Sequence, residues 1–136
     1  MIAIDTNILV RIITNDNPQQ VKKAVRILSK TDVFLSKTVL LETEWVLRYL
    51  YHKNPSEIIE AFQSFLGLPN VTVENISQIL LAFEWFSAGL DFADALHLAS
   101  SEKAKTFMSF DSKFCKKAKK LPSITLKLLN PDKDNA

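Results

Sequence analysis

The first nine residues constrain the fold of this chain more than any other stretch. Residues 1–4 form a short apolar run without alternation, and the polar triplet Asp5, Thr6 and Asn7 ends it abruptly. Such a run is typical of a buried central strand in a parallel sheet, and its carboxyl end falls at Asp5. Apolar residues recur at helical spacing over residues 8–13, so the triplet would begin a helix. Ligands of open α/β sheets bind at this edge, although helix capping alone explains Asp5 equally well.

Signals for strands and helices alternate along the rest of the chain. Short apolar strands are expected at residues 33–35, 71–73, 106–110 and 124–128. Helices are expected at residues 18–29, 36–51, 55–66 and 75–88, from residue 91 onward, and after residue 111. This alternation predicts an α/β fold, a three-layer sandwich in which helices flank a mostly parallel central sheet of about four to five strands. We expect one domain at residues 1–129, followed by a polar tail at residues 130–136.

Composition excludes several classes of protein. The single cysteine, Cys115, cannot form an internal disulfide or a multi-cysteine zinc site, and two histidines exclude most histidine-rich metal sites. No segment reaches the roughly 18 apolar residues of a membrane span, and no secretory leader is visible, so we expect a soluble, cytoplasmic protein. The formal charge of +2 is too small to indicate a polyanionic partner by itself.

Four aspartates lie where expected strands end or helices begin. Asp5 and Asp111 each directly follow a strand, and parallel strands would bring both to one edge of the sheet. Asp91 and Asp94 share a helix face, where like charges repel. Asp91 is explained as the N-cap, whereas the small neighbours of Asp94 would let its helix approach the strand ends, so we assign function to Asp94. His97, one turn later, is better explained as a buried or capping histidine than as a zinc ligand.

Two glutamates on the helix expected after residue 36 need separate explanations. Glu42 and Glu44 are two positions apart and cannot share a face. Glu44 has Arg48 four residues later, so an exposed ion pair accounts for it. The neighbours of Glu42 include Val39 and Val46, which places its carboxylate beside the stripe expected to pack inward. A charge there is costly unless it is paired or binds a metal, so Glu42 is the functional candidate.

Carboxylates from four separate segments are therefore expected to gather at one place: Asp5, Glu42, Asp94 and Asp111. Their mutual repulsion would raise their pKa values unless a cation neutralised them. Sites made only of oxygen ligands suit Mg²⁺ or Mn²⁺. Metal ions held in this way activate water for attack on a phosphodiester and stabilise the leaving oxygen.

Four segments of the chain together resemble a known family. They read MIAIDTNIL at residues 1–9, LETEWVLR at 41–48, DFADAL at 91–96 and SFDSKF at 109–114. In this order they look like a PIN-domain nuclease, and the likeness is closest to the VapC-type toxins of toxin–antitoxin systems. The resemblance covers nearly the whole chain and implies a metal-dependent endoribonuclease whose acidic residues are the four carboxylates named above.

The same resemblance implies partners and supporting residues. The residues expected to support the site from its rim are Thr6, Asn7, Asp91 and Ser109. The family further suggests RNA as the substrate, a homodimer, and an antitoxin protein whose tail lies across the active-site groove. The sequence departs from the family pattern at His97, where the family has an apolar residue.

Basic and aromatic side chains suggest contact surfaces. Five lysines crowd the helix after Asp111, where a phosphate backbone would approach the metal edge: Lys113, Lys116, Lys117, Lys119 and Lys120. A solvated helix face explains such a run equally well. Arg11 and Arg48 are further candidates for contact with nucleic acid. The aromatic residues 45, 49, 51, 62 and 65 are expected mostly in the core, with a dimer or antitoxin contact as the alternative.

Two other functions remain open at this point. Aspartate-nucleophile phosphatases share the opening strand, but their chemistry needs an acid two residues after the nucleophile, where this chain has Asn7. A regulatory module that only binds a protein partner is the second alternative. Retention of all four carboxylates argues against it, because an unpaired acidic cluster destabilises a fold that holds no metal.

Overall fold

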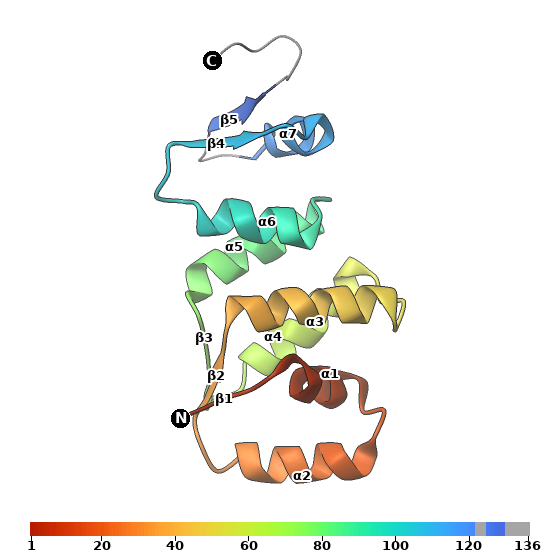
Figure 1. Cartoon of the computed structure of the whole chain (residues 1–136). Coiled ribbons are helices and arrows are strands. Elements are labelled where there is room, and N and C mark those ends of the chain that lie inside the picture. Colours follow the sequence, from red (N-terminus) through yellow and green to blue (C-terminus); the bar gives the residue numbers. More distant parts are fainter. Residues whose placement is uncertain (122–124, 130–136) are drawn as a thin grey trace. The chain divides into compact units, whose positions relative to one another are not determined.

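The computed structural model describes residues 1–121 and 125–129 (Figure 1). The chain divides into two compact units, residues 1–79 and residues 80–136, which are described one after the other. Seven helices and five strands lie in the described residues. None of these helices has the length and apolarity required to span a bilayer.

The first unit is a parallel sheet with its connecting helices. Strands β1 (Ile2–Ala3), β2 (Val33–Leu35) and β3 (Val71–Val73) lie in that order, and both pairings are parallel. The helices are α1 (Thr6–Thr14), α2 (Pro18–Leu28), α3 (Lys37–Tyr49) and α4 (Pro55–Leu66). Two helices follow each of the first two strands before the chain returns to the sheet, as parallel crossovers require.

Apolar side chains from the sheet and three helices form the core of this unit. The most completely buried are Leu9, Leu35, Leu40, Leu47, Ile58 and Phe62. Helix α1 packs against α2 and α3, and α4 packs against α3 and β3. Burial of each such side chain contributes about 1.5 to 3 kcal/mol, so α3, which supplies Leu40 and Leu47, has one strongly preferred rotation about its axis.

Strand β1 is more exposed than its sequence predicts. It is an outer strand of the three-stranded sheet, and Ile2 is 42% exposed. Ile4, the last apolar residue before the polar triplet, is buried. Within the described part of this unit, β1 pairs with β2 and is the last strand of its sheet, so its expected central position in a larger sheet stays a prediction.

The second unit contains a smaller sheet. Helix α5 (Ile76–Ser87) crosses the boundary between the units, and α6 (Phe92–Ser100), β4 (Thr106–Ser109), α7 (Ser112–Ala118) and β5 (Thr125–Leu128) follow. Strands β4 and β5 pair in parallel, with α7 as their connection. Aromatic contacts join the elements: the ring centroids of Phe86 and Phe92 are 5.2 Å apart, and those of Phe107 and Phe114 are 5.5 Å apart.

The predicted α/β class and its parallel strands are confirmed, and the five strands are distributed over two sheets. The last strand begins at Thr125, and Ile124, where we expected it to begin, lies outside the described residues. The tail expected at residues 130–136 also lies outside them. The assignment of residues 1–129 to one domain stays a prediction.

Capping side chains set the helix boundaries where the sequence predicts them. Asn17 accepts a hydrogen bond from the backbone N–H of Gln20, with Pro18 in the first turn of α2. Asn54 and Glu57 form a reciprocal capping box at the start of α4, with distances of 2.9 and 3.0 Å. Each side chain satisfies a backbone donor that a helix terminus otherwise leaves unpaired.

Substituting Asn54 by alanine tests the capping box. The Asn54→Ala variant should lose about 1 kcal/mol of unfolding free energy, because the N–H of Glu57 then lacks its partner. Urea unfolding followed by circular dichroism measures the change. Ser56→Ala, in the same exposed turn, is the control and should change stability by less than about 0.5 kcal/mol; equal losses in both variants would contradict the capping role.

Candidate functional site

Asp5 lies at the junction between β1 and α1. Its backbone carbonyl accepts hydrogen bonds from the N–H groups of Ile8 and Leu9, but its side chain makes no capping hydrogen bond. The carboxylate is exposed, and the neighbouring Thr6 is buried while Asn7 is exposed. The carboxylate of Asp5 therefore takes no part in capping α1. Capping does not explain this carboxylate, and another role is indicated.

The structure reverses the predicted positions of the two glutamates of α3. Glu44 is only 1% exposed, and its carboxylate pairs with Arg48, with 2.8 Å between Oε2 and Nε. Glu42 is exposed. The ion pair is confirmed, but its expected exposure and the expected inward position of Glu42 are both wrong. The stripe of Val39, Val46 and Leu50 does not form the packed face, since Leu50 is 66% exposed.

The packing of α3 explains this reversal. Helices α1 and α4 cover the face that carries Leu40 and Leu47, and Glu44 lies on the same side. Thr43 is also buried there, and in the described part of the chain its hydroxyl has no hydrogen-bond partner. Glu42 consequently presents its carboxylate on the outer face of the helix, where it is available to a ligand without a desolvation penalty.

In the second unit, two aspartates are helix caps. Asp91 caps α6 and accepts hydrogen bonds from the N–H groups of Ala93 and Asp94, as predicted. Asp111 caps α7 by accepting from the N–H of Phe114 at 3.0 Å. The backbone N–H of Asp111 in turn donates to the Ser109 hydroxyl. This capping role of Asp111 was not expected from the sequence, although an aspartate directly before a helix is the usual signal for it.

Asp94 lies in the first turn of α6 and carries an unfavourable charge. Its pKa is raised by partial burial, then by the negative charges of Asp91 and Asp111, with His97 acting in the opposite direction. Asp91 and Asp111 are thus both close enough to repel the carboxylate of Asp94. His97 is exposed in the last turn of α6, so the first of its two expected roles, burial, is wrong. The second, a role at the helix end, agrees with its position, because a cation is favourable there.

The four predicted metal ligands are divided between the units. Asp5 and Glu42 belong to the first unit, and Asp94 and Asp111 belong to the second. In residues 1–121 and 125–129, no three histidine, cysteine, aspartate or glutamate side chains gather closely enough to hold a metal ion. The convergence of all four carboxylates stays a prediction.

A cluster missed by the sequence analysis joins the ends of α1 and α3. The hydroxyl of Tyr51 donates to Asp16 at 2.6 Å, and Arg11 lies 3.6 Å from the same carboxylate. This hydrogen bond to Asp16 is the main cause of a raised pKa of Tyr51. The cluster borders a cavity of about 210 Å³ that Asn7 and Val46 also line. Its partners lie 35 residues apart, so no local pattern could have indicated it.

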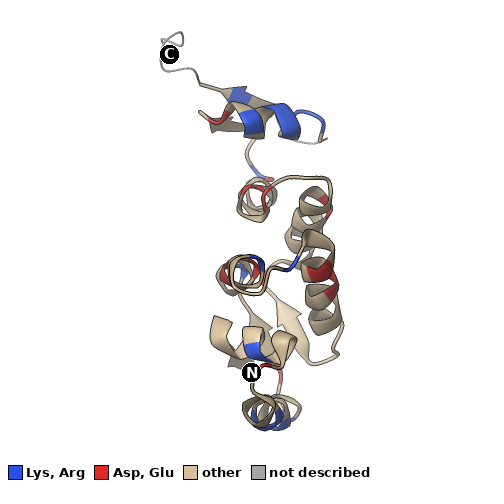
Figure 2. Cartoon of the chain, turned by 90° about the vertical axis from the view of Figure 1, so that its right-hand side faces the viewer, with Lys and Arg blue, Asp and Glu red and all other residues tan. Residues whose placement is uncertain are grey.

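The residues predicted to contact nucleic acid differ in their surroundings. The lysines of α7 are exposed, and Figure 2 shows how densely basic residues cover that helix. One of them, Lys117, donates to the carbonyl of Gly89 at 3.4 Å. Arg11 is paired with Asp16 at 3.6 Å, and both side chains are exposed. Arg48 is held more firmly, because its partner Glu44 is buried and lies 2.8 Å away.

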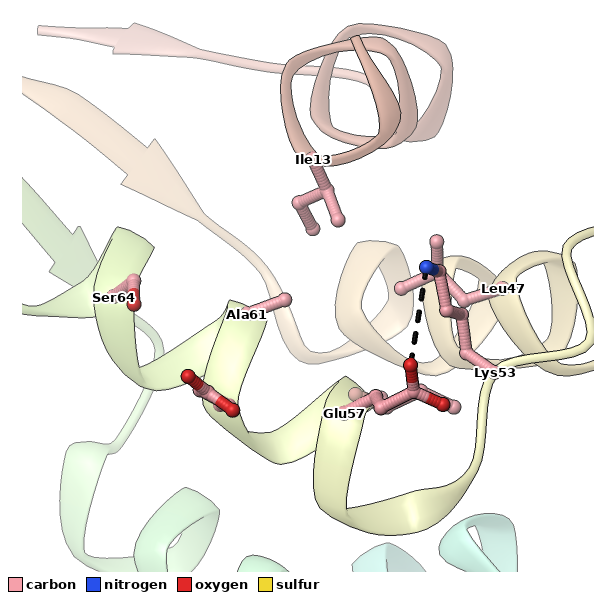
Figure 3. Close-up of a pocket in the computed structure, with 8 residues that line it drawn as sticks. Ile13, Leu47, Lys53, Glu57, Ala61 and Ser64 are labelled. Atoms are coloured by element: carbon pink, nitrogen blue, oxygen red, sulfur yellow. Dashed lines mark ion pairs between the residues drawn. The ribbon is translucent and has the colours of Figure 1, made fainter. Parts of the chain in front are cut away.

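A larger cavity lies in the first unit. It measures about 320 Å³ and opens between α1, α3 and α4 (Figure 3). Ile13 and Leu47 form its apolar side, and Lys53 and Glu57 form an ion pair of 4.0 Å beside it. None of the predicted site residues lines it.

Comparison with known proteins decides the family. The family model described as PIN domain matches residues 2–120. The chain belongs to the PIN-domain family. Among solved structures, this PIN domain is similar to VapC20 of Mycobacterium tuberculosis, described as a sarcin-ricin loop cleaving toxin, with 22% sequence identity and a TM-score of 0.40. The match covers 84% of this chain and 92% of that one, and no curated protein matches the sequence.

Substitution of the two glutamates separates their roles in stability. Glu44→Gln should lower the unfolding free energy by about 1 to 3 kcal/mol, because it leaves Arg48 without its buried counter-charge. Arg48 is partly exposed, which limits the loss. Glu42→Gln, on the outer face, is the matched control and should stay within about 0.5 kcal/mol. Urea unfolding measures both, and a larger loss in Glu42→Gln would show that the faces are assigned wrongly.

Asp94→Asn should raise the melting temperature of the metal-free protein at neutral pH. The folded chain holds the Asp94 proton to a higher pH than the unfolded chain, so stability falls as the pH rises through the interval between the two pKa values. The gain in melting temperature should be complete above that interval. It should vanish below about pH 3.9, where Asp94 is protonated in both the folded and the unfolded chain.

Calorimetry in chelator at pH values above and below this interval measures the effect. Glu84→Gln, which replaces an exposed acid of α5, serves as the control. A lower melting temperature of Asp94→Asn at neutral pH would contradict the claim that the ionised form of Asp94 is disfavoured in the folded protein.

Proposed function

We propose that this PIN domain is a metal-dependent endoribonuclease and acts in the cytoplasm as the toxin of a toxin–antitoxin pair. Family membership and the four sequence segments support the class of activity. The observation that carries the proposal is the match of the PIN-domain family model to residues 2–120. Asp94 adds to it, because burial and the charges of Asp91 and Asp111 disfavour its ionised form, and a bound cation would relieve this. We assign the metal to Asp5, Glu42, Asp94 and Asp111.

The donor set fits Mg²⁺ or Mn²⁺. All four proposed ligands are carboxylates, the oxygen donors that these hard cations prefer. Asp5 makes no side-chain cap and Glu42 faces outward, while the Asp111 cap engages only Oδ1. When bound, such an ion supplies an activated water and stabilises the leaving oxygen of a phosphodiester.

The supporting residues hold these carboxylates in place. Asp91 caps α6 and so fixes the first turn that carries Asp94. The Ser109 hydroxyl accepts from the Asp111 N–H and fixes the junction between β4 and α7. We assign Thr6 and Asn7 the corresponding role beside Asp5. Asn7 has no ionisable proton to give, which disfavours the phosphatase alternative.

Basic residues would bind the RNA backbone. Lys113, Lys116 and Lys117 are exposed on α7, directly after Asp111, and can neutralise phosphates near the reacting bond. Arg11 and Arg48 would add guanidinium groups, which suit phosphate geometry. The sequence resemblance to VapC-type toxins further supports a homodimer and an antitoxin that covers the groove.

Cleavage of RNA tests the proposal directly. Asp94→Asn and Asp111→Asn should each lower Mn²⁺-dependent or Mg²⁺-dependent cleavage by at least about 100-fold, because each removes one charge from the metal site. Gel analysis of a single-stranded RNA with the purified protein measures this. Glu60→Gln, an exposed acid of α4, should cleave like the parent.

Chelator is the second arm of this experiment. It should abolish cleavage by the parent, and millimolar Mn²⁺ should raise the melting temperature of the parent more than that of Asp94→Asn. Parent protein without activity, with identical melting curves in metal and in chelator, would favour the protein-binding module instead.

A further inference from the structure

Helix α3 presents two aromatic rings to solvent. Trp45 is 50% exposed and Tyr49 is 56% exposed, whereas the other tryptophan, Trp85, is 3% exposed. The ring centroids of Trp45 and Tyr49 are 4.8 Å apart, with 33° between the planes. Two large rings beside each other on an outer helix face form an apolar surface that water solvates poorly.

A buried charge fixes the orientation of this aromatic pair. The guanidinium carbon of Arg48 lies 4.9 Å from the centroid of the Tyr49 ring, a cation–π contact. The same guanidinium group is held by Glu44, which the packing of α3 buries. The rings are therefore ordered before any ligand arrives, which lowers the entropy lost on binding.

The pair shares a helix face with a proposed metal ligand. Glu42, Trp45 and Tyr49 occupy positions i, i+3 and i+7 of α3. At 1.5 Å per residue, the two ring-bearing residues lie about 4.5 and 10.5 Å along the axis from Glu42. A polynucleotide whose reacting phosphate lies at Glu42 would have neighbouring bases within reach of the rings.

We infer that Trp45 and Tyr49 form a stacking platform for the bases of single-stranded RNA, an inference that rests on the proposed function and specifies its substrate. Aromatic rings with an adjacent guanidinium group are the usual means of binding unpaired bases, because every base offers a π face. Bases in a duplex are already stacked on both sides and do not reach such a platform. The platform would thus favour single-stranded segments and position them without selecting a sequence.

Binding measured in chelator tests the platform without cleavage. The probes are a single-stranded RNA of about ten nucleotides, an oligomer of equal length without bases, and a duplex RNA. The single strand should quench tryptophan emission, because Trp45 is exposed and Trp85 is buried. The oligomer without bases and the duplex should leave the emission unchanged.

Variants identify the rings as the cause. Trp45→Leu and Tyr49→Leu should each weaken binding of labelled RNA by about 5-fold to 150-fold, the range for loss of one stacked base. Trp45→Phe should restore most of the affinity. Leu50→Ala is the matched control, since Leu50 is exposed at the C-cap of the same helix and carries no ring, and the affinity of this variant should equal that of the parent.

The inference would be overturned if the oligomer without bases quenched the tryptophan emission, or if Trp45→Leu and Leu50→Ala bound RNA with equal affinity. It would also be overturned if the parent were a dimer that the Trp45→Leu substitution dissociates without changing the affinity for RNA. The last result would assign the rings to contact between two copies. Because binding in chelator needs no catalysis, an inactive parent that still stacks RNA would refute only the nuclease proposal. Full cleavage by Trp45→Leu with unchanged RNA affinity would refute only the platform.

Discussion

The ion pair between Glu44 and Arg48 is the interaction on which the functional surface of the first unit depends. A carboxylate that is 1% exposed is tolerated in a packed face only with a counter-charge, and Arg48 supplies it from the next turn. Together with Leu40 and Leu47, this pair fixes the rotation of α3. That rotation leaves Glu42 and the rings of Trp45 and Tyr49 on the outer face, so interior packing determines which side chains can meet a ligand.

Helix N-termini organise the acids of the second unit. Asp91 and Asp111 cap α6 and α7, and Asp94 lies within the first turn of α6. The positive end of a helix dipole partly offsets the repulsion among nearby carboxylates, which allows a negative cluster to persist in the absence of a cation. Burial of Asp94 and, after it, the remaining repulsion from Asp91 and Asp111 raise the pKa of Asp94. Asp5 occupies the N-cap position of α1, but its side chain accepts no capping hydrogen bond.

Local sequence signals predicted the order of helices and strands well, because a helix cap or a short strand depends on only a few neighbouring residues. Asn17, Asn54 and Asp91 begin helices as expected. The rotation of α3 was predicted wrongly because both of its faces carry apolar residues, so periodicity cannot distinguish the packed side; only contact with α1 and α4 decides it. Contacts between distant residues, such as Tyr51 with Asp16, leave no local trace in the sequence.

The cluster of Arg11, Asp16 and Tyr51 has a consequence for the geometry of the first unit. Asp16 follows α1, the helix that Asp5 begins, and Tyr51 follows α3, the helix that carries Glu42. The hydrogen bond between Tyr51 and Asp16 therefore links the carboxyl ends of α3 and α1, which pack against each other. The link at the carboxyl ends of the two helices thus restrains the position of Asp5, at the start of α1, relative to Glu42, in the middle of α3.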